Sequence, residues 1–150
     1  MTRDGENKGA SADFAALPES DWRALAAYVE PVECRAGEPL FSEGEAASGL
    51  YFFLDGRFAV QKKGELPGKM QTVALLAGGS VAGEGALVGI ARHRASLLCL
   101  ESGRALCLTT AAHVRLREEN PRLCLTLLHY LLRISALRLS GASERLAVLL

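Results

Sequence analysis

The sequence predicts a mainly β protein with flanking helices, in which an antiparallel roll or sandwich is followed by one long apolar helix. Between Val32 and Thr109, short apolar stretches are separated by glycines at a spacing typical of many short strands. After Thr110 the apolar residues recur every three or four positions, which is the period of an α-helix. With 150 residues, of which 49% are hydrophobic, the chain can bury one core of ordinary size.

The N-terminal part is predicted to contain a disordered leader followed by one helix. Residues 1–12 are polar and contain no apolar segment of the kind found in secretory signals. Leu17-Pro18-Glu19-Ser20-Asp21 has the acidic residues that favour a helix start. Pro31 is expected to end this helix. Its apolar face consists of Trp22, Leu25, Ala26 and Val29.

Two hairpins are expected within the strand-rich region. The first spans residues 50–61 around Asp55-Gly56, a pair that strongly favours a two-residue turn. The second surrounds Ser102-Gly103, and in it Cys99 and Cys107 would point to opposite faces, so no disulfide could join them. The four cysteines form no C-x-x-C pair, which disfavours a zinc site and indicates a reduced, cytoplasmic protein.

Two helices are expected after the strands. Thr110 caps one through about Glu119, and Asn120-Pro121 begins a second that is apolar almost all round up to Leu139. The two apolar faces of such a helix must both be buried, one against the roll and the other against a partner, most simply a second copy of the chain. Gly141 is expected to end it, so that residues 121–150 comprise a dimerisation helix and the start of another helix at Ser143. The predicted homodimer seam has heptad spacing and consists of Leu123, Leu127, Tyr130, Ile134 and Leu137.

The charge balance argues against DNA binding by these residues. Seventeen basic residues match seventeen acidic ones, whereas phosphate neutralisation needs a basic surplus. Residues 71–150 nevertheless carry nine arginines, no lysine and five glutamates, and arginine suits bidentate capture of an anion. No uninterrupted apolar run reaches the length of a membrane span, so no membrane partner is expected.

A cluster of glycines and charged residues indicates an anion-binding loop. Residues 78–87 contain four glycines and Glu84, and Arg94 follows shortly after them. Glycines allow backbone N–H groups to converge on an anion, and a guanidinium adds a fork for a phosphate. A carboxylate can only accept hydrogen bonds, so Glu84 suits sugar hydroxyls. The segment therefore predicts either a receptor for a sugar phosphate or a glycine-rich loop that a Glu84–Arg94 salt bridge ties down.

Three segments resemble the motifs of cyclic nucleotide-binding domains. Residues 36–45 resemble the opening motif, residues 50–56 the next segment, and residues 83–87 with 94–96 the phosphate-binding cassette. The long helix followed by SERLAVLL further resembles the regulator branch that includes the catabolite activator and the fumarate–nitrate reductase regulator. The resemblance implies a domain over residues 13–120 in which flanking helices accompany an antiparallel β-roll, also called a jelly roll or double-stranded β-helix. The roll itself is expected over residues 32–109. It implies a DNA partner only through a further, C-terminal helix-turn-helix domain.

The same resemblance assigns the ligand contacts. Glu84 would hold a ribose 2′-hydroxyl and Arg94 the cyclic phosphate, with cAMP as the expected effector and no metal. The family's base-contacting Thr-Ser pair falls at Arg138 and Leu139, so Arg138 is the candidate contact there. The remaining cassette positions are Gly83, Gly85, Ala86, Leu87, Ala95 and Ser96, of which Ser96 is the nearest substitute for a hydroxyl that catabolite activators carry at the position of Ala95.

Other functions remain open. The domain could be a dimeric interaction module with a degenerate pocket, or a sensor of another ligand such as haem or a gas. Histidines and cysteines would then supply ligands, although only Cys34 precedes Cys99, which disfavours an iron–sulfur site. An enzyme is not expected, because the chain contains no H-x-H pair of the cupin type, no G-x-S-x-G motif and no Walker loop. The candidate histidines are His93, His113 and His129.

Overall fold

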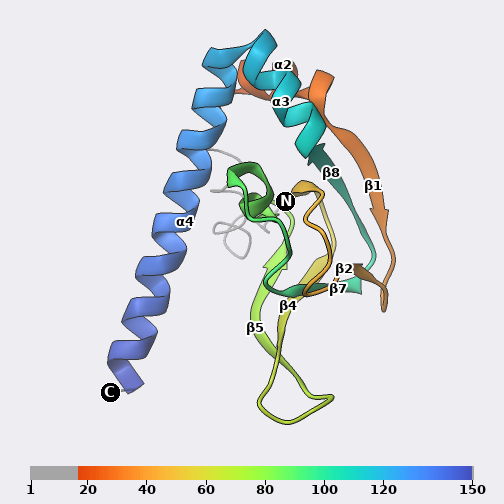
Figure 1. Cartoon of the computed structure of the whole chain (residues 1–150), viewed down its shortest axis with the longest axis vertical. Helices are drawn as coiled ribbons and strands as arrows, with labels where there is room; N and C mark the ends of the chain where they lie inside the picture. The colour runs from red at the N-terminus through yellow and green to blue at the C-terminus, as the bar shows by residue number, and fades with distance from the viewer. Residues whose placement is uncertain (1–16, 150) are drawn as a thin grey trace, which may run out of the picture.

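The computed structural model describes residues 17–149, so the predicted leader at residues 1–12 lies outside the described residues. Two four-stranded antiparallel sheets form the roll, and helices cover one end and one side of it (Figure 1). The strand order is β1-β8-β3-β6 in the first sheet and β2-β7-β4-β5 in the second. The strands are β1 (Glu30–Cys34), β2 (Pro39–Phe41), β3 (Gly49–Phe53), β4 (Arg57–Lys63), β5 (Met70–Ala77), β6 (Val81–Ala82), β7 (Ser96–Glu101) and β8 (Gly103–Thr109). The predicted mainly β fold with an antiparallel roll is confirmed.

Both predicted hairpins are wrong in their pairing. β3 pairs with β8 and β6, whereas β4 pairs with β7 and β5, so the Asp55-Gly56 corner carries the chain from one sheet to the other. The corner at Ser102 likewise joins β7 and β8 in different sheets. The Asp55 carboxylate accepts hydrogen bonds from the Arg104 backbone N–H at 2.6 Å and from its guanidinium at 2.9 Å, and thereby links the two corners. A local turn signal therefore indicated a change of direction correctly but could not indicate which strands pair.

The core consists of two clusters of buried side chains. One lies inside the roll and includes Phe53 and Phe58, and the other joins the first sheet to the helices through Phe52 and Leu127. Cys99 and Cys107, predicted to point to opposite faces, both lie in the first cluster, because their strands belong to different sheets. Burial raises the pKa of the nearby Cys34 thiol to about 11. All four cysteines are buried free thiols.

The helices begin where the sequence indicated. Helix α2 (Glu19–Leu25) and a short 3-10 helix η1 (Ala26–Tyr28) end before Pro31, as expected. Helix α3 (Thr110–Glu119) is capped by Thr109, one residue earlier than predicted, because its hydroxyl accepts a hydrogen bond from the Ala112 N–H at 3.1 Å. Helix α4 (Pro121–Leu149) starts at the predicted proline, and the Asn120 side chain accepts a hydrogen bond from the Leu123 N–H.

The predicted break in the last helix is wrong. Helix α4 runs through Gly141 and Ser143 without interruption. Glycine in a helix interior costs only about 1 kcal/mol relative to alanine, which good helix formers on both sides can offset. Gly141 also lacks the positive φ of a helix-ending glycine.

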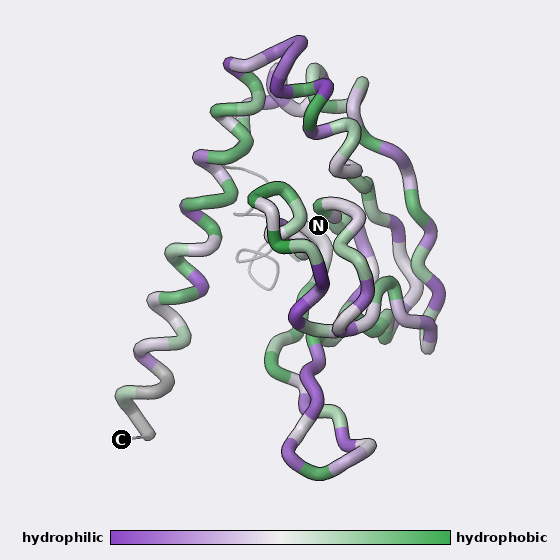
Figure 2. Tube along the Cα trace, viewed as in Figure 1, coloured by the Kyte–Doolittle hydropathy of each residue, from purple (hydrophilic) through white to green (hydrophobic). Residues whose placement is uncertain are grey.

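The predicted dimer seam faces the chain's own core rather than a partner. Leu123, Leu127, Tyr130 and Ile134 are at most 4% exposed and pack on the first sheet and the other helices, so they offer no surface to a second copy. Leu137, the fifth member, is exposed. The expectation of two apolar faces on α4 is confirmed, but the roll covers the face that was assigned to the partner. Figure 2 shows apolar and polar positions alternating along α4.

A further apolar stripe runs along α4 beside the buried face, and two of its members, Leu128 and Leu132, lie next to the roll and line a cavity there. The helical period places five residues on it, and we call them the outer stripe: Leu125, Leu128, Leu132, Ala136 and Leu139. Leu125, Leu132 and Leu139 are each 69% exposed, and Leu128 is half-buried. The segment Pro121–Glu144 is long and apolar enough, by length and composition, to cross a membrane, which was not expected from the sequence. Burial of one face in the core accounts for part of this apolar character without a membrane.

Candidate ligand-binding site

A cavity of about 760 Å³ lies between the second sheet, the segment at residues 81–95 and α4. This volume is within the range of small-molecule sites in proteins. Its walls are mostly apolar, and its polar lining side chains come from the cassette region and from α4. In Figure 1 the cassette is the green helical turn between the roll and α4. The polar lining side chains are Glu84, His93, Arg94, Ser135 and Arg138.

The predicted helical turn after Gly83 is confirmed. Gly83 has φ 82°, and a side chain there would come within 2.6 Å of the Gly49 carbonyl oxygen, so only glycine fits this corner. The 3-10 helix η2 (Glu84–Val88) follows directly and ends at Gly89, which also has a positive φ of 84°. Two left-handed glycines therefore fix both ends of the turn and point Glu84 at the cavity.

Glu84 and Arg94 both line the cavity, as predicted. The alternative in which these two residues form a salt bridge is not what the structure shows, because Glu84 is paired with Arg138. Arg94 is exposed and forms no salt bridge with another described residue. Its guanidinium is therefore available to an anion.

The other cassette positions divide into two groups. Gly83, Gly85, Leu87 and Ala95 line the cavity. Ala86 and Ser96 do not, and the Ala86 N–H donates to the Gly83 carbonyl at 3.1 Å. The Ser96 hydroxyl accepts a hydrogen bond from the Glu43 N–H at 2.8 Å, so it stabilises a neighbouring loop rather than replacing a hydroxyl at Ala95.

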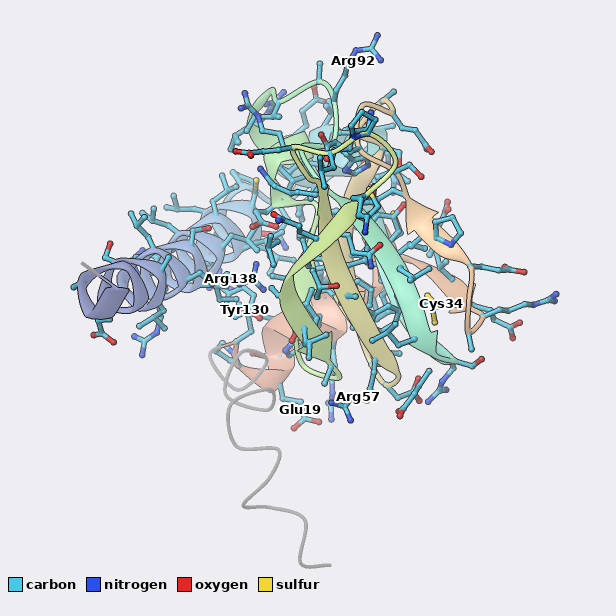
Figure 3. All side chains as sticks on the ribbon, turned by 90° about the horizontal axis from the view of Figure 1, so that it is seen from below. Glu19, Cys34, Arg57, Arg92, Tyr130 and Arg138 are labelled. Carbon is cyan, nitrogen blue, oxygen red and sulfur yellow. The ribbon has the colours of Figure 1, made fainter. Side chains whose placement is uncertain are left out.

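Arg138 reaches the cavity from α4. Its Nη2 donates to the Val81 carbonyl oxygen at 2.7 Å, and its Nη1 lies 3.4 Å from Oε1 of Glu84. Both members of this ion pair are about one-third exposed. Figure 3 shows Arg138 between α4 and the roll. The predicted ligand contact at Arg138 thus belongs to the cavity, although its partners in the structure are protein groups.

A stacked pair of rings in the cavity wall was not predicted from the sequence. The rings of Phe41 and His93 are nearly parallel at 8°, with centroids 3.8 Å apart, and both residues line the cavity. Burial lowers the pKa of His93, so its ring is neutral at pH 7, and its Nε2 has no hydrogen-bond partner among the described residues. No motif indicated this pair, because only the folding of the roll brings Phe41 next to His93.

The other metal-ligating candidates are scattered. His113 is buried beside Cys124 at 3.6 Å, and His129 is exposed on α4. Burial lowers the pKa of His113 and raises that of Cys124, so both are neutral at pH 7. Within residues 17–149, no three or more histidine, cysteine or acidic side chains gather in a group that could hold a metal ion.

Comparison with known proteins identifies the family. The model of the cyclic nucleotide-binding domain matches residues 31–120, which is more than half of the chain. A search of curated proteins found no match. Among solved structures, a cyclic nucleotide-binding domain from Methylobacillus flagellatus is similar with a TM-score of 0.79 and 22% identity, over 95% of this chain and 83% of that one.

Two further similar structures are of a catabolite activator protein and of a domain of a transcriptional regulator. The catabolite activator protein of Thermus thermophilus has a TM-score of 0.75 and 26% identity, over 91% of this chain and 62% of that one, so this chain spans less than two-thirds of its length. The N-terminal domain of a transcriptional regulator from Streptomyces coelicolor has a TM-score of 0.71 and 23% identity, over 88% of this chain and 90% of that one. With its glycine-bounded cassette and the match over residues 31–120, the chain belongs to the cyclic nucleotide-binding domain family.

Proposed function

We propose that this chain is a regulatory domain that binds a cyclic nucleotide, with cAMP as the first candidate, and signals through α4. The observation that carries the proposal is that Glu84 and Arg94 line one cavity of suitable size. A guanidinium is a bidentate donor for a phosphate, and a carboxylate accepts hydrogen bonds from sugar hydroxyls. One ligand that carries a phosphate next to a sugar hydroxyl would bind both residues at once.

The remaining walls suit the apolar faces of a purine. Val60 and Leu76 contribute from the second sheet, and Leu131 contributes from α4. Burial of a planar base against such side chains is favourable through the loss of apolar surface to water. Because part of this wall belongs to α4, ligand binding would favour the position of α4 that closes best on the base, which is a population shift.

We further propose a homodimer through the outer stripe. Its five residues recur at steps of three and four along α4, as in the seam of a two-helix interface. Two copies of the stripe would cover each other and remove exposed leucines from water. A contact of this kind would also connect the ligand cavities of the two subunits, because in each subunit α4 forms a wall of the cavity and would contact α4 of the other subunit.

The similarity to transcription regulators supports a role as their effector part. The Thermus protein is a catabolite activator, and the Streptomyces protein is a transcriptional regulator. We propose that DNA is contacted through an additional domain and that these 150 residues, with zero formal charge, do not bind it themselves. A cytoplasmic location and the lack of enzymatic activity belong to the same proposal.

Calorimetric titration of the whole chain with cAMP and with cGMP tests the ligand. We expect saturable binding of at least one of them, and we expect Arg94→Ala to weaken it roughly tenfold to a hundredfold through loss of a charge-assisted bond. Arg92→Ala is the matched control, because Arg92 is exposed nearby, binds the Gly44 carbonyl at 2.8 Å and does not line the cavity. If neither nucleotide binds at millimolar concentration, the pocket is degenerate or takes another ligand, and the proposal is rejected.

A further inference from the structure

We propose that Arg138 is a built-in competitor for Glu84, which makes the cavity respond selectively to ligands that carry a hydroxyl donor next to their anionic group. In the structure the Arg138 guanidinium is paired with the Glu84 carboxylate, which would otherwise accept a hydrogen bond from such a hydroxyl. A ligand with the hydroxyl would displace Arg138 from Glu84 and loosen the attachment of α4. The proposal rests on the proposed function of the cavity.

The contact pattern of Arg138 supports this role. One nitrogen holds the Val81 carbonyl at 2.7 Å, and the other approaches Glu84 at 3.4 Å, so a single guanidinium attaches α4 both to strand β6 and to the cassette. Among the described residues that line the cavity, Glu84 is the one with a carboxylate. The one negatively charged hydrogen-bond acceptor among these described lining residues is therefore already paired with Arg138.

The two charged groups expected to bind the ligand differ in whether they already have a partner. Arg94 is exposed and has no ion-pair partner among the described residues, whereas Glu84 is already paired. A ligand that carries an anion alone can bind Arg94 without disturbing α4. A ligand that also carries a hydroxyl donor must compete with Arg138. The same pocket would consequently bind both ligands, but only the second would change the contacts of α4.

The competition is energetically feasible. Both partners of the ion pair are about one-third exposed and their nitrogen–oxygen distance is long, so solvent weakens their attraction. A hydroxyl that donates to an ionised carboxylate forms a charge-assisted bond, which is stronger than a neutral one. Displaced Nη1 can be hydrated at this exposed position while Nη2 keeps the Val81 carbonyl.

Displacement of Arg138 from Glu84 would affect the end of α4, because Arg138 lies beyond the buried part of the helix. The buried residues of the helix end at Ile134. Beyond it, Arg138 is the described residue of α4 whose side chain is hydrogen-bonded to the roll. Figure 1 shows the following part of the helix running free of the roll. Release of Glu84 therefore weakens the last attachment before this free part.

Calorimetry with two ligands tests the competition. Arg138→Met keeps an apolar stem of similar length, and Arg133→Met is the matched control because Arg133 is exposed on the same helix and does not line the cavity. We expect Arg138→Met to bind cAMP about two- to fivefold more tightly than wild type, as expected for removal of an exposed ion pair. We expect no change for 2′-deoxy-cAMP, which lacks the competing hydroxyl. Weaker cAMP binding, or an equal change for both ligands, would overturn the proposal.

Hydrogen exchange separates this proposal from that of cyclic nucleotide binding. Without any added ligand, the backbone of residues 139–149 should exchange faster in Arg138→Met than in Arg133→Met, because the last attachment is lost. Unchanged exchange overturns the role of Arg138 even if cAMP binds. Failure of every cyclic nucleotide to bind wild type would instead reject the proposed ligand, and the exchange result would still decide whether Arg138 holds α4.

Discussion

The β-roll and helix α4 are stabilised in different ways. In the roll, strands from distant parts of the chain pair with each other, and Phe52, Phe53 and Phe58 are completely buried between or beside the sheets. In α4 one face is buried up to Ile134, and the outer stripe is largely exposed apart from the half-buried Leu128. The ligand cavity lies between a firmly packed element and a partly attached one. Such an arrangement allows a ligand to move the second element without unfolding the first.

The largest effect is expected in the roll. Phe52→Ala removes a completely buried ring, and we expect the free energy of unfolding to fall by about 3–5 kcal/mol in urea denaturation. Leu54→Ala is the control, because Leu54 lies two residues away and is 41% exposed. A similar loss in both variants would contradict the complete burial of the Phe52 ring.

The two faces of α4 should differ by a smaller amount. Leu127→Ala removes a fully buried side chain and should lower the free energy of unfolding by about 2–5 kcal/mol. Leu132→Ala, in the outer stripe, should change it by no more than about 0.5 kcal/mol when measured at a concentration too low for dimers. The opposite order would mean that the roll covers the other face.

The outer stripe can be tested through the oligomeric state. Leu125→Glu combined with Leu139→Glu places charges in the proposed interface at two positions outside the cavity lining, so light scattering should show a dimer for wild type and a monomer for the double variant. Leu137→Glu is the control, because Leu137 is exposed on another side of the helix and should leave the dimer intact. A dimer that survives the double change would place the interface elsewhere.

The smallest effect concerns pH. Burial holds the pKa of His93 below its usual value of about 6.5, so folding favours the neutral ring. The resulting stability is fully present above pH 6.5 and is lost as the pH falls toward the pKa in the folded state. The free energy of unfolding should therefore fall between pH 7 and pH 5, and less steeply in His93→Gln. His129→Gln, which changes an exposed ring, should keep the wild-type slope.

The cassette could be predicted because its information is local. Gly83 and Glu84 are adjacent in sequence, and a glycine that can adopt a positive φ allows the tight turn that follows it. The start of α4 was predictable for the same reason, since the cap at Asn120 and the proline after it act over one turn.

Strand pairing and helix orientation depend on contacts between distant residues. The sequence 50–61 contains a turn signal, but the partners of β3 lie at β6 and β8. Heptad spacing shows that α4 has apolar faces without indicating which one the roll covers. The contact between Arg138 and Glu84 combines both difficulties, because it requires the rotation of α4 and the position of the cassette.

The continuity of α4 through Gly141 gives the helix the mechanics of a lever. Its 29 residues form a rod of about 43 Å at 1.5 Å per residue. The part packed against the roll acts as the fulcrum, and about 16 Å of helix extends beyond Arg138. A tilt of roughly 10° at that residue would displace the far end by about 3 Å over this length. A break at Gly141 would have absorbed such a tilt at a joint, whereas an unbroken rod converts a change of one side-chain contact into a displacement of its end.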